Sequence, residues 1–464
     1  MNAGEIPSTL DHTPKPSAGT ALILATIVLA TTTVVFNWNT FLHIDQRREA
    51  PSVVAERYNL YTRYILHTDA YLQHPDALRI PDALALLTTN DTDAFIYLLI
   101  ESTTALGKGR FYMPLSNFDL CLTYLLPGSI VLLLTGWPPL VVHNLFFLVV
   151  FFLNGLFAFA FLRTLSRHLG LALLGALSYQ GCNFVFSSHH LGHMNNIQLQ
   201  WIPLIFLAVW QLLSSERRAL RWTVLLGVGM GLQVLSSPYY TLFLCFAILP
   251  VFVLVYLIIA LRQRLLATEH LIPLALQGLL AGTIALLVSL FYIIPRLGTP
   301  PRVYSVNAAT WRPYVLNDYL ELLDPMDPAL FIGLPLFVLM ILAVRWWYEH
   351  SRPLTSAVGM TMVVSLVLML PAVPGTPFWF FYHIVPLANH LRVPLRCFPI
   401  FYLMLISLTT LYLNHVFRDL SSIRRSMVVV GLLSVFVCSN WLVSPWAFDL
   451  DLVSIIKKLL NYHS

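Results

Sequence analysis

The chain has 464 residues, of which 58% are hydrophobic and only 11% are charged, whereas soluble domains usually carry about 25% charged residues. One chain cannot bury so much apolar surface in a water-soluble core, so the composition excludes an ordinary soluble protein and predicts lipid as the solvent. The net charge of +5 is modest. It is assigned to cytoplasmic loops, and nucleic-acid binding is not predicted.

The N-terminal region consists of a polar leader followed by an apolar run. Residues 1–18 are polar and contain proline, and they are predicted to be disordered and cytoplasmic. Gly19–Phe36 is uninterrupted and long enough to cross the hydrocarbon of a bilayer. Because no basic leader and no small-residue cleavage site mark it, the run is predicted to be a retained span and not a removed signal peptide.

A long polar region, residues 37–138, is predicted to form the first outer loop. Within it, Asp91–Leu106 has an apolar centre and polar ends, typical of a helix that lies in the membrane interface. Asp119–Thr135 is apolar but contains Pro127 and Gly128. The segment Asp119–Thr135 is predicted not to cross the membrane, because only then do all the short arginine-rich loops lie on one side of it.

Later apolar runs are clearer, and with the first run they predict an all-α polytopic membrane domain of about eleven transmembrane helices over residues 19–444. Every second connection between these runs carries arginine, as expected for cytoplasmic loops. The alternate connections and the tail, residues 445–464, are then outside. The later runs are Pro139–Leu162, Gly170–Phe186, Ile197–Leu213, Trp222–Leu235, Thr241–Leu261, Leu271–Ile294, Ala329–Val344, Leu354–Leu370, Ile400–Phe417 and Met427–Val443.

Two carboxylates, Asp91 and Asp93, begin the interfacial segment as a D-x-D pattern. Either could cap the N-terminus of a helix, where the backbone dipole favours negative charge. Either could instead act as a general base towards a hydroxyl acceptor, or bind a metal. Both interpretations stay open. The pattern leaves a divalent cation, Mg²⁺ or Mn²⁺, open as a cofactor without assigning any metal ligand.

Three other polar clusters are predicted on the same outer side. His189, His190 and His193 with Asn195 could bind an anion, or simply meet water and headgroups at a turn. Arg392 and Arg396 precede a late span, where guanidinium groups could hold phosphate or anchor the chain at the interface. Tyr239 and Tyr240 occupy a short outer turn.

The apolar runs contain no clear mid-membrane acidic or basic residue. Ion-coupled transporters and proton relays usually need such groups. The pattern therefore favours chemistry at the membrane surface.

Three motifs resemble those of the GT-C superfamily, the polytopic glycosyltransferases that use polyprenyl-phosphate-linked sugars. One is an acidic residue in the first outer loop, followed by a segment that ends in a glycine-containing run. Another is a histidine-rich turn between two spans, and the last is an arginine pair separated by proline. In this chain the motifs are Asn90-Asp91 with Ala105–Gly109, His190–Asn195 with Gln200–Leu204, and Leu391–Arg396.

The resemblance implies an inverting transfer of a sugar from a polyprenyl phosphate to an acceptor hydroxyl of a glycan, lipid or protein, on the outer face of a bacterial inner or plasma membrane. It implies Asp91 as the base. His189, His190, His193, Asn195, Tyr239, Tyr240, Arg392 and Arg396 would bind the phosphate and the sugar. The long stretch before Asp91 departs from several branches of the superfamily, which makes Asp45 and Asp93 competitors. The alternatives are a transporter or flippase of lipid-linked or polar solutes, and a non-catalytic GT-C-like subunit.

Overall fold

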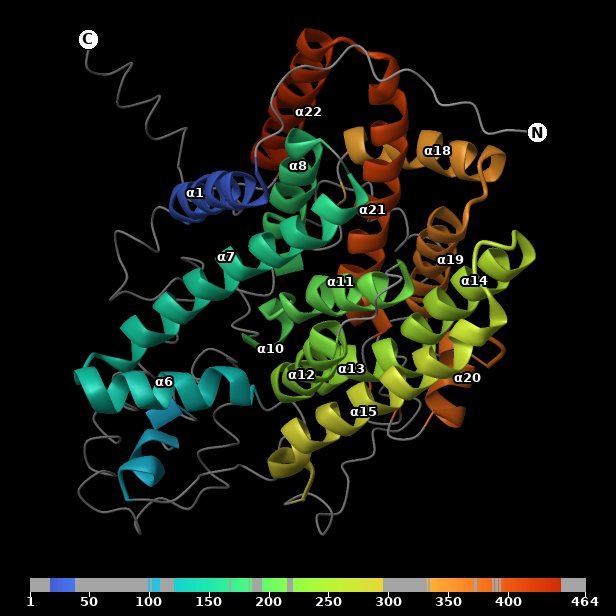
Figure 1. The fold of residues 1–464 in the computed structure, drawn as a ribbon. Helices are drawn as coiled ribbons and strands as arrows, with labels where there is room; N and C mark the ends of the chain where they lie inside the picture. Colours follow the sequence, from blue (N-terminus) through green and yellow to red (C-terminus); the bar gives the residue numbers. More distant parts are fainter. Residues whose placement is uncertain are drawn as a thin grey trace, which may run out of the picture.

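The computed structural model describes the chain over residues 17–37, 99–100, 102–108, 121–166, 168–182, 184–185, 194–214, 220–294, 334–370, 374–385 and 394–443, with the single residues 332, 388 and 391. Within these ranges the chain is helical and contains no strand (Figure 1). The major helices are α1 (Ala18–Phe36), α6 (Leu122–Thr135), α7 (Pro139–Leu165), α8 (Leu169–Gln180), α11 (Trp201–Ser214), α12 (Leu220–Ser236), α14 (Leu249–Arg262), α15 (Leu271–Ile293), α18 (Leu334–Glu349), α19 (Pro353–Leu368), α21 (Phe398–Val416) and α22 (Ser422–Val443).

Short helical elements lie between or extend these helices. They are α10 (Met194–Ile197), α13 (Pro238–Phe243), the π-helix η1 (Leu244–Ile248), the 3₁₀-helix η2 (Thr268–His270), α20 (Pro377–Ile384), and the 3₁₀-helices η5 (Pro394–Cys397) and η6 (Phe417–Asp419). The elements η1 and η5 lead directly into α14 and α21, and they lengthen those two rods.

Five described helical stretches are long and apolar enough to cross a membrane. They are Pro139–Leu165, Met194–Ser214, Pro238–Arg262, Thr268–Leu290 and Pro394–Val416. Shorter apolar helices, α1, α6, α8, α12 and α19 among them, accompany these stretches. A helix rises about 1.5 Å per residue, so stretches of 21 to 27 residues reach across a hydrocarbon core of about 30 Å. The chain is therefore a multi-pass helical membrane protein.

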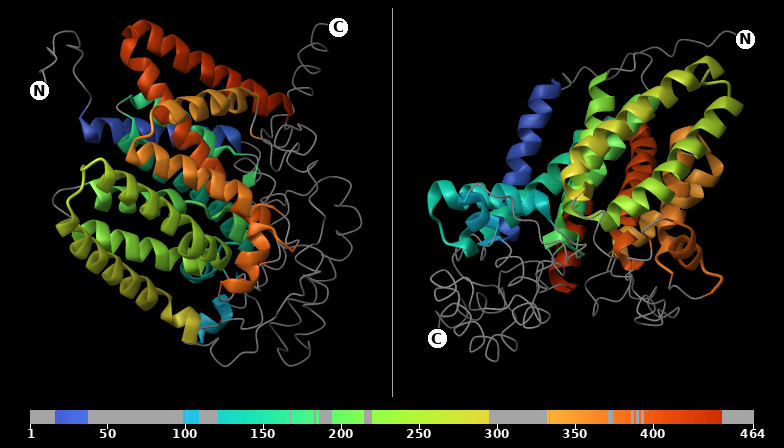
Figure 2. Two further views of the ribbon diagram at one scale, coloured as in Figure 1. Left: turned by 90° about the vertical axis from the view of Figure 1, so that its right-hand side faces the viewer. Right: turned by 90° about the horizontal axis from the view of Figure 1, so that it is seen from below.

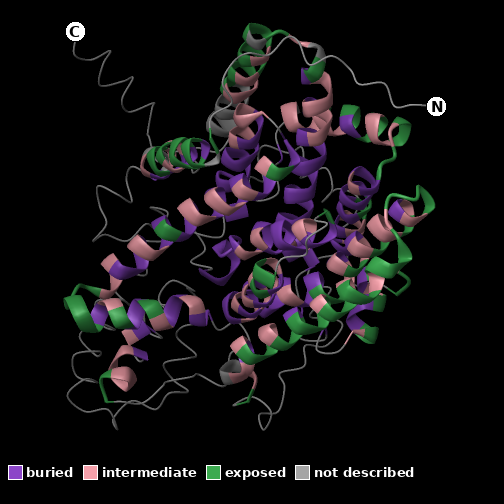
Figure 3. Cartoon of the chain, in the orientation of Figure 1, coloured by how far each residue is buried: buried purple, intermediate pink, exposed green. Residues whose placement is uncertain are grey.

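The helices pack as one continuous bundle around α21 and α11 (Figure 2). α7 packs on α8, α11 and α1, while α21 packs on α8, α18 and α19. α12 pairs with α15, and α14 pairs with α19. Figure 3 shows that buried residues concentrate in the centre of this bundle, whereas the outer faces of α1 and α15 are largely exposed. Exposed leucine and isoleucine on those faces are expected where lipid is the solvent.

Four connections lie together at one end of the bundle, which we call the arginine end. Gln263 after α14 donates to the Ser351 carbonyl before α19 at 3.2 Å. The rings of His350 and His415 lie 5.1 Å apart, which joins the end of α18 to the end of α21. His168, before α8, packs on Phe417 at 5.7 Å. Arginines of these connections, including Arg163, Arg262, Arg264, Arg352 and Arg418, thus share one end, in agreement with the alternation in the sequence.

Two predicted continuous spans are wrong in detail, because the helices are broken. The predicted span Gly170–Phe186 ends as a regular helix at Gln180 and is followed by a turn at Gly181. The predicted span Ile197–Leu213 is interrupted at residues 198–200, between α10 and α11. The first break follows Gly181, and the second falls on Gln198, Leu199 and Gln200 at the start of the predicted run. The break at residues 198–200 is supported by hydrogen bonds from other helices, which are described below.

The predicted non-crossing segment Asp119–Thr135 contains the helix α6. It has 14 residues and keeps Pro127 inside the helix, and it ends at Gly136, whose φ of 64° lies in the left-handed region that glycine tolerates. At about 1.5 Å per residue it is about 21 Å long. α8 is shorter still at 12 residues, so length does not separate interfacial from crossing helices here. The non-crossing assignment of α6 stays a prediction.

Close packing of α12 on α15 depends on two glycines. A Cβ atom at Gly227 would lie 2.7 Å from the Ala281 carbonyl oxygen, and one at Gly231 would lie 2.6 Å from Cβ of Val288. Gly229, on another face of α12, would only touch Ile205 at an ordinary 3.4 Å. Small residues let helix backbones approach closely where lipid provides no hydrophobic drive for helix pairing.

We expect Gly227→Ala to destabilise the protein by about 1–3 kcal/mol, because α15 must move away from the new methyl group. Gly229→Ala is the matched control in the same helix, and it should be neutral or slightly stabilising because alanine is the better helix former by about 1 kcal/mol. Thermal unfolding in detergent measures both variants. Equal midpoints for the two variants would contradict the described α12–α15 packing.

Candidate functional site

The centre of the candidate site is the short connector of residues 196–200, where α10 ends and α11 begins. The break frees backbone carbonyls in a buried region, where each unpaired group costs several kcal/mol. Three carbonyls of the connector are paired by side chains from three different helices. The Tyr240 hydroxyl donates to Asn196 O at 3.0 Å, Asn154 Nδ2 donates to Ile197 O at 2.9 Å, and the Tyr179 hydroxyl donates to Leu199 O at 3.3 Å.

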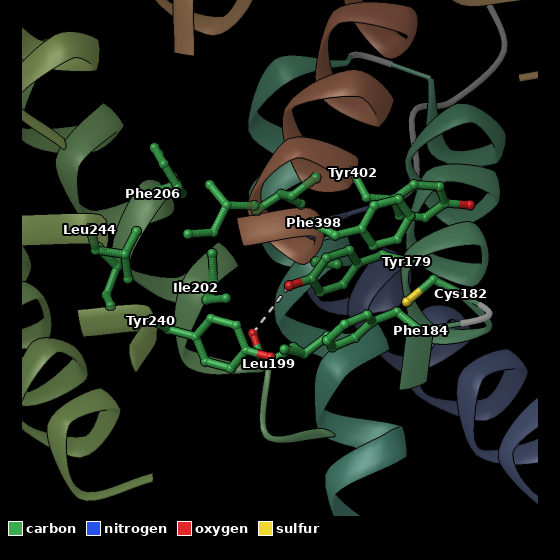
Figure 4. Packing of buried hydrophobic residues seen from close by; sticks show 14 of the residues in the cluster. Tyr179, Cys182, Phe184, Leu199, Ile202, Phe206, Tyr240, Leu244, Phe398 and Tyr402 are labelled. Atoms are coloured by element: carbon green, nitrogen blue, oxygen red, sulfur yellow. Dashed lines mark hydrogen bonds between the residues drawn. The ribbon is translucent and has the colours of Figure 1, made fainter. Parts of the chain in front are cut away.

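Figure 4 shows two of these donors, Tyr179 and Tyr240, beside the connector. Tyr179 from α8 points at Leu199 along the dashed line, and Tyr240 lies on the other side, next to Ile202. The rings of Phe398 and Tyr402 of α21 lie near Tyr179 and stack on each other, with their centroids 5.6 Å apart. The connector is therefore held by α7, α8 and α13 at once, which fixes its position in the bundle.

A second polar network ties the connector to α6 and α12. Gln198 hydrogen-bonds the side chains of Thr123 and Cys121, and Thr123 also hydrogen-bonds Ser236 at 2.8 Å. The indole nitrogen of Trp201 donates to Ser236 at 2.7 Å. These contacts hold the start of α6, which lies within the predicted first outer loop, against the end of α12.

Arg396 in η5 supplies a buried cation next to this network. Its side chain is only 6% exposed, and Cζ lies 3.9 Å from the centroid of the Tyr239 ring. A guanidinium group over an aromatic face is stabilised by about 0.5–2 kcal/mol, with the larger values where water is excluded. Tyr239 is itself 1% exposed and adjoins Tyr240 in α13. The stack therefore connects the beginning of α21 to the connector.

An aromatic layer from α20 flanks α13. The rings of Phe243 and Phe381 stack at 5.4 Å, and Thr376 caps α20 by accepting the Trp379 N–H at 3.3 Å. Burial raises the pKa of the Tyr382 phenol above its usual value. This hydroxyl therefore stays neutral and can serve as a hydrogen-bond donor at physiological pH.

Several buried polar atoms around the connector make no hydrogen bond with the described residues. Asn154 and Asn196 each leave Oδ1 unpaired, Ser237 leaves Oγ unpaired, and Gln200 leaves Oε1 unpaired. An unpaired buried polar group costs about 1–3 kcal/mol, so such groups call for an explanation. Together they give this part of the bundle the capacity to bind hydroxyl groups of a ligand.

Four of the predicted site residues are placed by the structure, and they belong to one region. Asn195 lies in α10 beside Asn196, the residue that Tyr240 contacts, and Tyr239 stacks on Arg396. All four are buried. The other predicted site residues, Asp91, Asp93, His189, His190, His193 and Arg392, lie outside the described residues, as does Asp45.

The sequence did not mark Asn154, Asn196, Gln198 or Ser236 as site residues. Each is polar in or next to an apolar run, and that is the only signal the sequence offers for them. Polar residues inside a membrane bundle usually face its interior and are often functional. Among the described residues no three histidine, cysteine, aspartate or glutamate side chains lie close enough to hold a metal ion.

Comparison of the sequence with protein families and with curated proteins gives no match. Function is therefore inferred from the residues and their arrangement.

We expect Tyr240→Phe to lower the free energy of unfolding by about 1–3 kcal/mol, because the buried Asn196 carbonyl loses its donor. Tyr412→Phe in α21 is the control, since the Tyr412 hydroxyl makes no hydrogen bond with the described residues. Its unfolding free energy should change by less than about 0.5 kcal/mol. Denaturation in detergent, followed by tryptophan fluorescence, compares the two, and equal losses would refute the role given to Tyr240.

Proposed function

We propose that the chain is a membrane glycosyltransferase of the GT-C type, which transfers a sugar from a polyprenyl-phosphate donor to an acceptor hydroxyl. One observation carries the proposal: the buried Arg396–Tyr239 stack adjoins a broken helix whose surroundings contain unpaired polar atoms. A buried guanidinium group is suited to hold a phosphate through paired hydrogen bonds. The unpaired amide and hydroxyl groups are suited to a sugar.

The proposed topology follows from the arginine end. If that end is cytoplasmic, as the positive-inside rule demands, Arg396 and the connector face the periplasm or the cell exterior. Residues 1–18 are then cytoplasmic, residues 37–138 form the first outer loop, and residues 445–464 form an outer tail. The domain over residues 19–444 has about eleven spans in this proposal. A lipid-linked donor would reach the site sideways from the bilayer.

In the proposed reaction, the acceptor oxygen attacks the anomeric carbon while the bond from that carbon to the phosphate oxygen breaks. The phosphate leaves with the electron pair, and Arg396 stabilises its developing charge. Arg392, His189, His190 and His193 are assigned to the same phosphate. Asp91 takes the proton of the acceptor hydroxyl as general base. A single displacement of this kind inverts the anomeric configuration. Asp93 and Asp45 remain the competing bases.

A divalent cation, Mg²⁺ or Mn²⁺, stays open as a cofactor at Asp91 and Asp93. Its role would be to neutralise charge on the donor phosphate. Measuring the rate of sugar transfer after adding a chelator, and again after restoring Mg²⁺ or Mn²⁺, decides whether a divalent cation is required.

Substituting Arg396 tests the phosphate site. We expect Arg396→Gln to weaken binding of undecaprenyl phosphate by at least about tenfold, since charge-assisted hydrogen bonds contribute about 1.5–3 kcal/mol. Arg396→Lys should retain part of the affinity. Arg345→Gln is the control, because Arg345 is exposed and pairs with Glu349 near the arginine end. Native mass spectrometry in detergent measures binding, and unfolding midpoints verify that each variant is folded.

Substituting Asp91 tests the chemistry separately. Asp91→Asn should reduce sugar transfer by about 10²–10⁴-fold while donor binding is retained, because only proton transfer is lost. Asp93→Asn and Asp45→Asn are the matched controls. An unchanged rate for Asp91→Asn would move the base to one of these residues.

The wild-type protein distinguishes the alternative functions. If it moves lipid-linked sugar across the membrane of vesicles without transferring the sugar, the chain is a flippase. If it is inactive in both assays, it is a non-catalytic subunit.

A further inference from the structure

A second candidate site lies at the arginine end, away from Arg396. Two clefts follow one another along α8, α21 and α22. The outer cleft, about 360 Å³ in volume, is lined by His168, Gly170, Phe417 and Arg425 among others. The inner cleft, about 50 Å³ in volume, lies between α8, α18, α21 and α22 and is mainly apolar. The outer cleft is within the range of about 300–1,000 Å³ that is typical of ligand sites, and the inner cleft is a narrow apolar space next to it.

The two clefts lie next to each other, with one buried cluster between them. Leu171 and Leu413 line the inner cleft, and Phe417 lines the outer one. These three residues form one buried cluster, against which Leu339 and Leu432 pack. The outer cleft contains the polar side chains His168, Arg425 and Ser426 among apolar ones, and the inner cleft, one turn further along the same helices, is mainly apolar.

We propose that this double cleft binds a diacyl phospholipid with an anionic headgroup from the leaflet at the arginine end. The phosphate would lie in the outer cleft, and part of one acyl chain would lie in the narrow inner cleft. This proposal does not depend on the proposed sugar transfer, because it uses the opposite end of the bundle.

Charge at the mouth favours an anion. Arg425 lines the mouth, and its Nε donates to the Leu420 carbonyl at 2.7 Å, which fixes the guanidinium group there. Arg418 is exposed nearby in the chain. The N-terminus of α8 begins at Leu169, beside His168, and its first backbone N–H groups add positive potential. Basic clefts between helices on the cytoplasmic side are suited to lipid phosphates.

A separate observation indicates that the inner cleft takes a ligand with an acceptor atom. Thr409 lines this cleft and is only 4% exposed, yet its Oγ1 makes no hydrogen bond with the described residues. A buried hydroxyl without a partner costs about 1–3 kcal/mol. An ester carbonyl of a phospholipid, placed between the phosphate and the acyl chain, would accept its hydrogen bond.

Neighbouring surface favours a lipid over a free anion. Ile423, Met427 and Val430 of α22 are 71%, 60% and 61% exposed, and Val430 lines the outer cleft. Such exposed apolar side chains belong against lipid tails. The mouth therefore lies next to a lipid-facing surface, and its apolar continuation would stay empty if only a free phosphate bound.

The test uses the full chain in detergent, with dioleoyl phosphatidylglycerol as the probe. We expect this lipid to raise the unfolding midpoint and to bind at least about tenfold more tightly than dioleoyl phosphatidylcholine, which has the same chains. Glycerol 3-phosphate should give no shift at the same concentration. Equal effects of both phospholipids, or a shift with glycerol 3-phosphate alone, would overturn the proposal.

Variants locate the binding. Leu432→Trp fills the inner cleft and should abolish the shift, while Arg425→Gln should weaken binding about tenfold. Arg424→Gln is the matched control, because it removes the same charge from the adjacent position, which does not line the cleft. Unfolding midpoints without lipid show which variants are folded. If Leu432→Trp is folded and binds phosphatidylglycerol like the wild type, the proposal is wrong even if Arg425→Gln fails to fold.

Discussion

The connector between α10 and α11 imposes the main constraint on this bundle. A broken helix in an apolar environment has free carbonyl groups that water cannot solvate, so other helices must supply donors. Asn154, Tyr179 and Tyr240 do so from α7, α8 and α13. The Ile197 and Leu199 carbonyls also accept backbone N–H groups, from Leu199 and Ile202. Moving α13 would take the Tyr240 donor from the Asn196 carbonyl, and moving α7 or α8 would remove one of the two donors from the Ile197 or the Leu199 carbonyl. The packing of three helices and the shape of the candidate site therefore depend on the same few hydrogen bonds.

The bundle has two chemically different ends. At the arginine end the cations are spread over connections, and Arg418 and Arg424 are exposed there. In the candidate site the cation Arg396 is buried on an aromatic ring. An exposed arginine is screened by water and salt, whereas a buried one acts strongly on any anion that reaches it. The proposed sugar-transfer site therefore has a buried cation, whereas the proposed phospholipid site lies at an end where several arginines are exposed to solvent.

The sequence predicted most helix positions closely, because uninterrupted apolar runs leave few choices in lipid. The predicted run Gly19–Phe36 corresponds to α1 at Ala18–Phe36, and Trp222–Leu235 corresponds to α12 at Leu220–Ser236. It could not predict the break at residues 198–200 or the π-helix Leu244–Ile248. The break is held by donors that α7, α8 and α13 bring to the backbone, and a hydropathy pattern does not contain these contacts.

The sequence by itself determined that the chain is a membrane protein, that arginines occur in every second connection, and that Arg396 directly precedes a late apolar run. Composition and charge alone carry that information, since transfer from water to lipid depends on residue type. Only the tertiary structure decided that Arg396 stacks on Tyr239 and that Tyr240 pairs with the connector. These partners come from separate helices, so their contact exists only once the helices have packed.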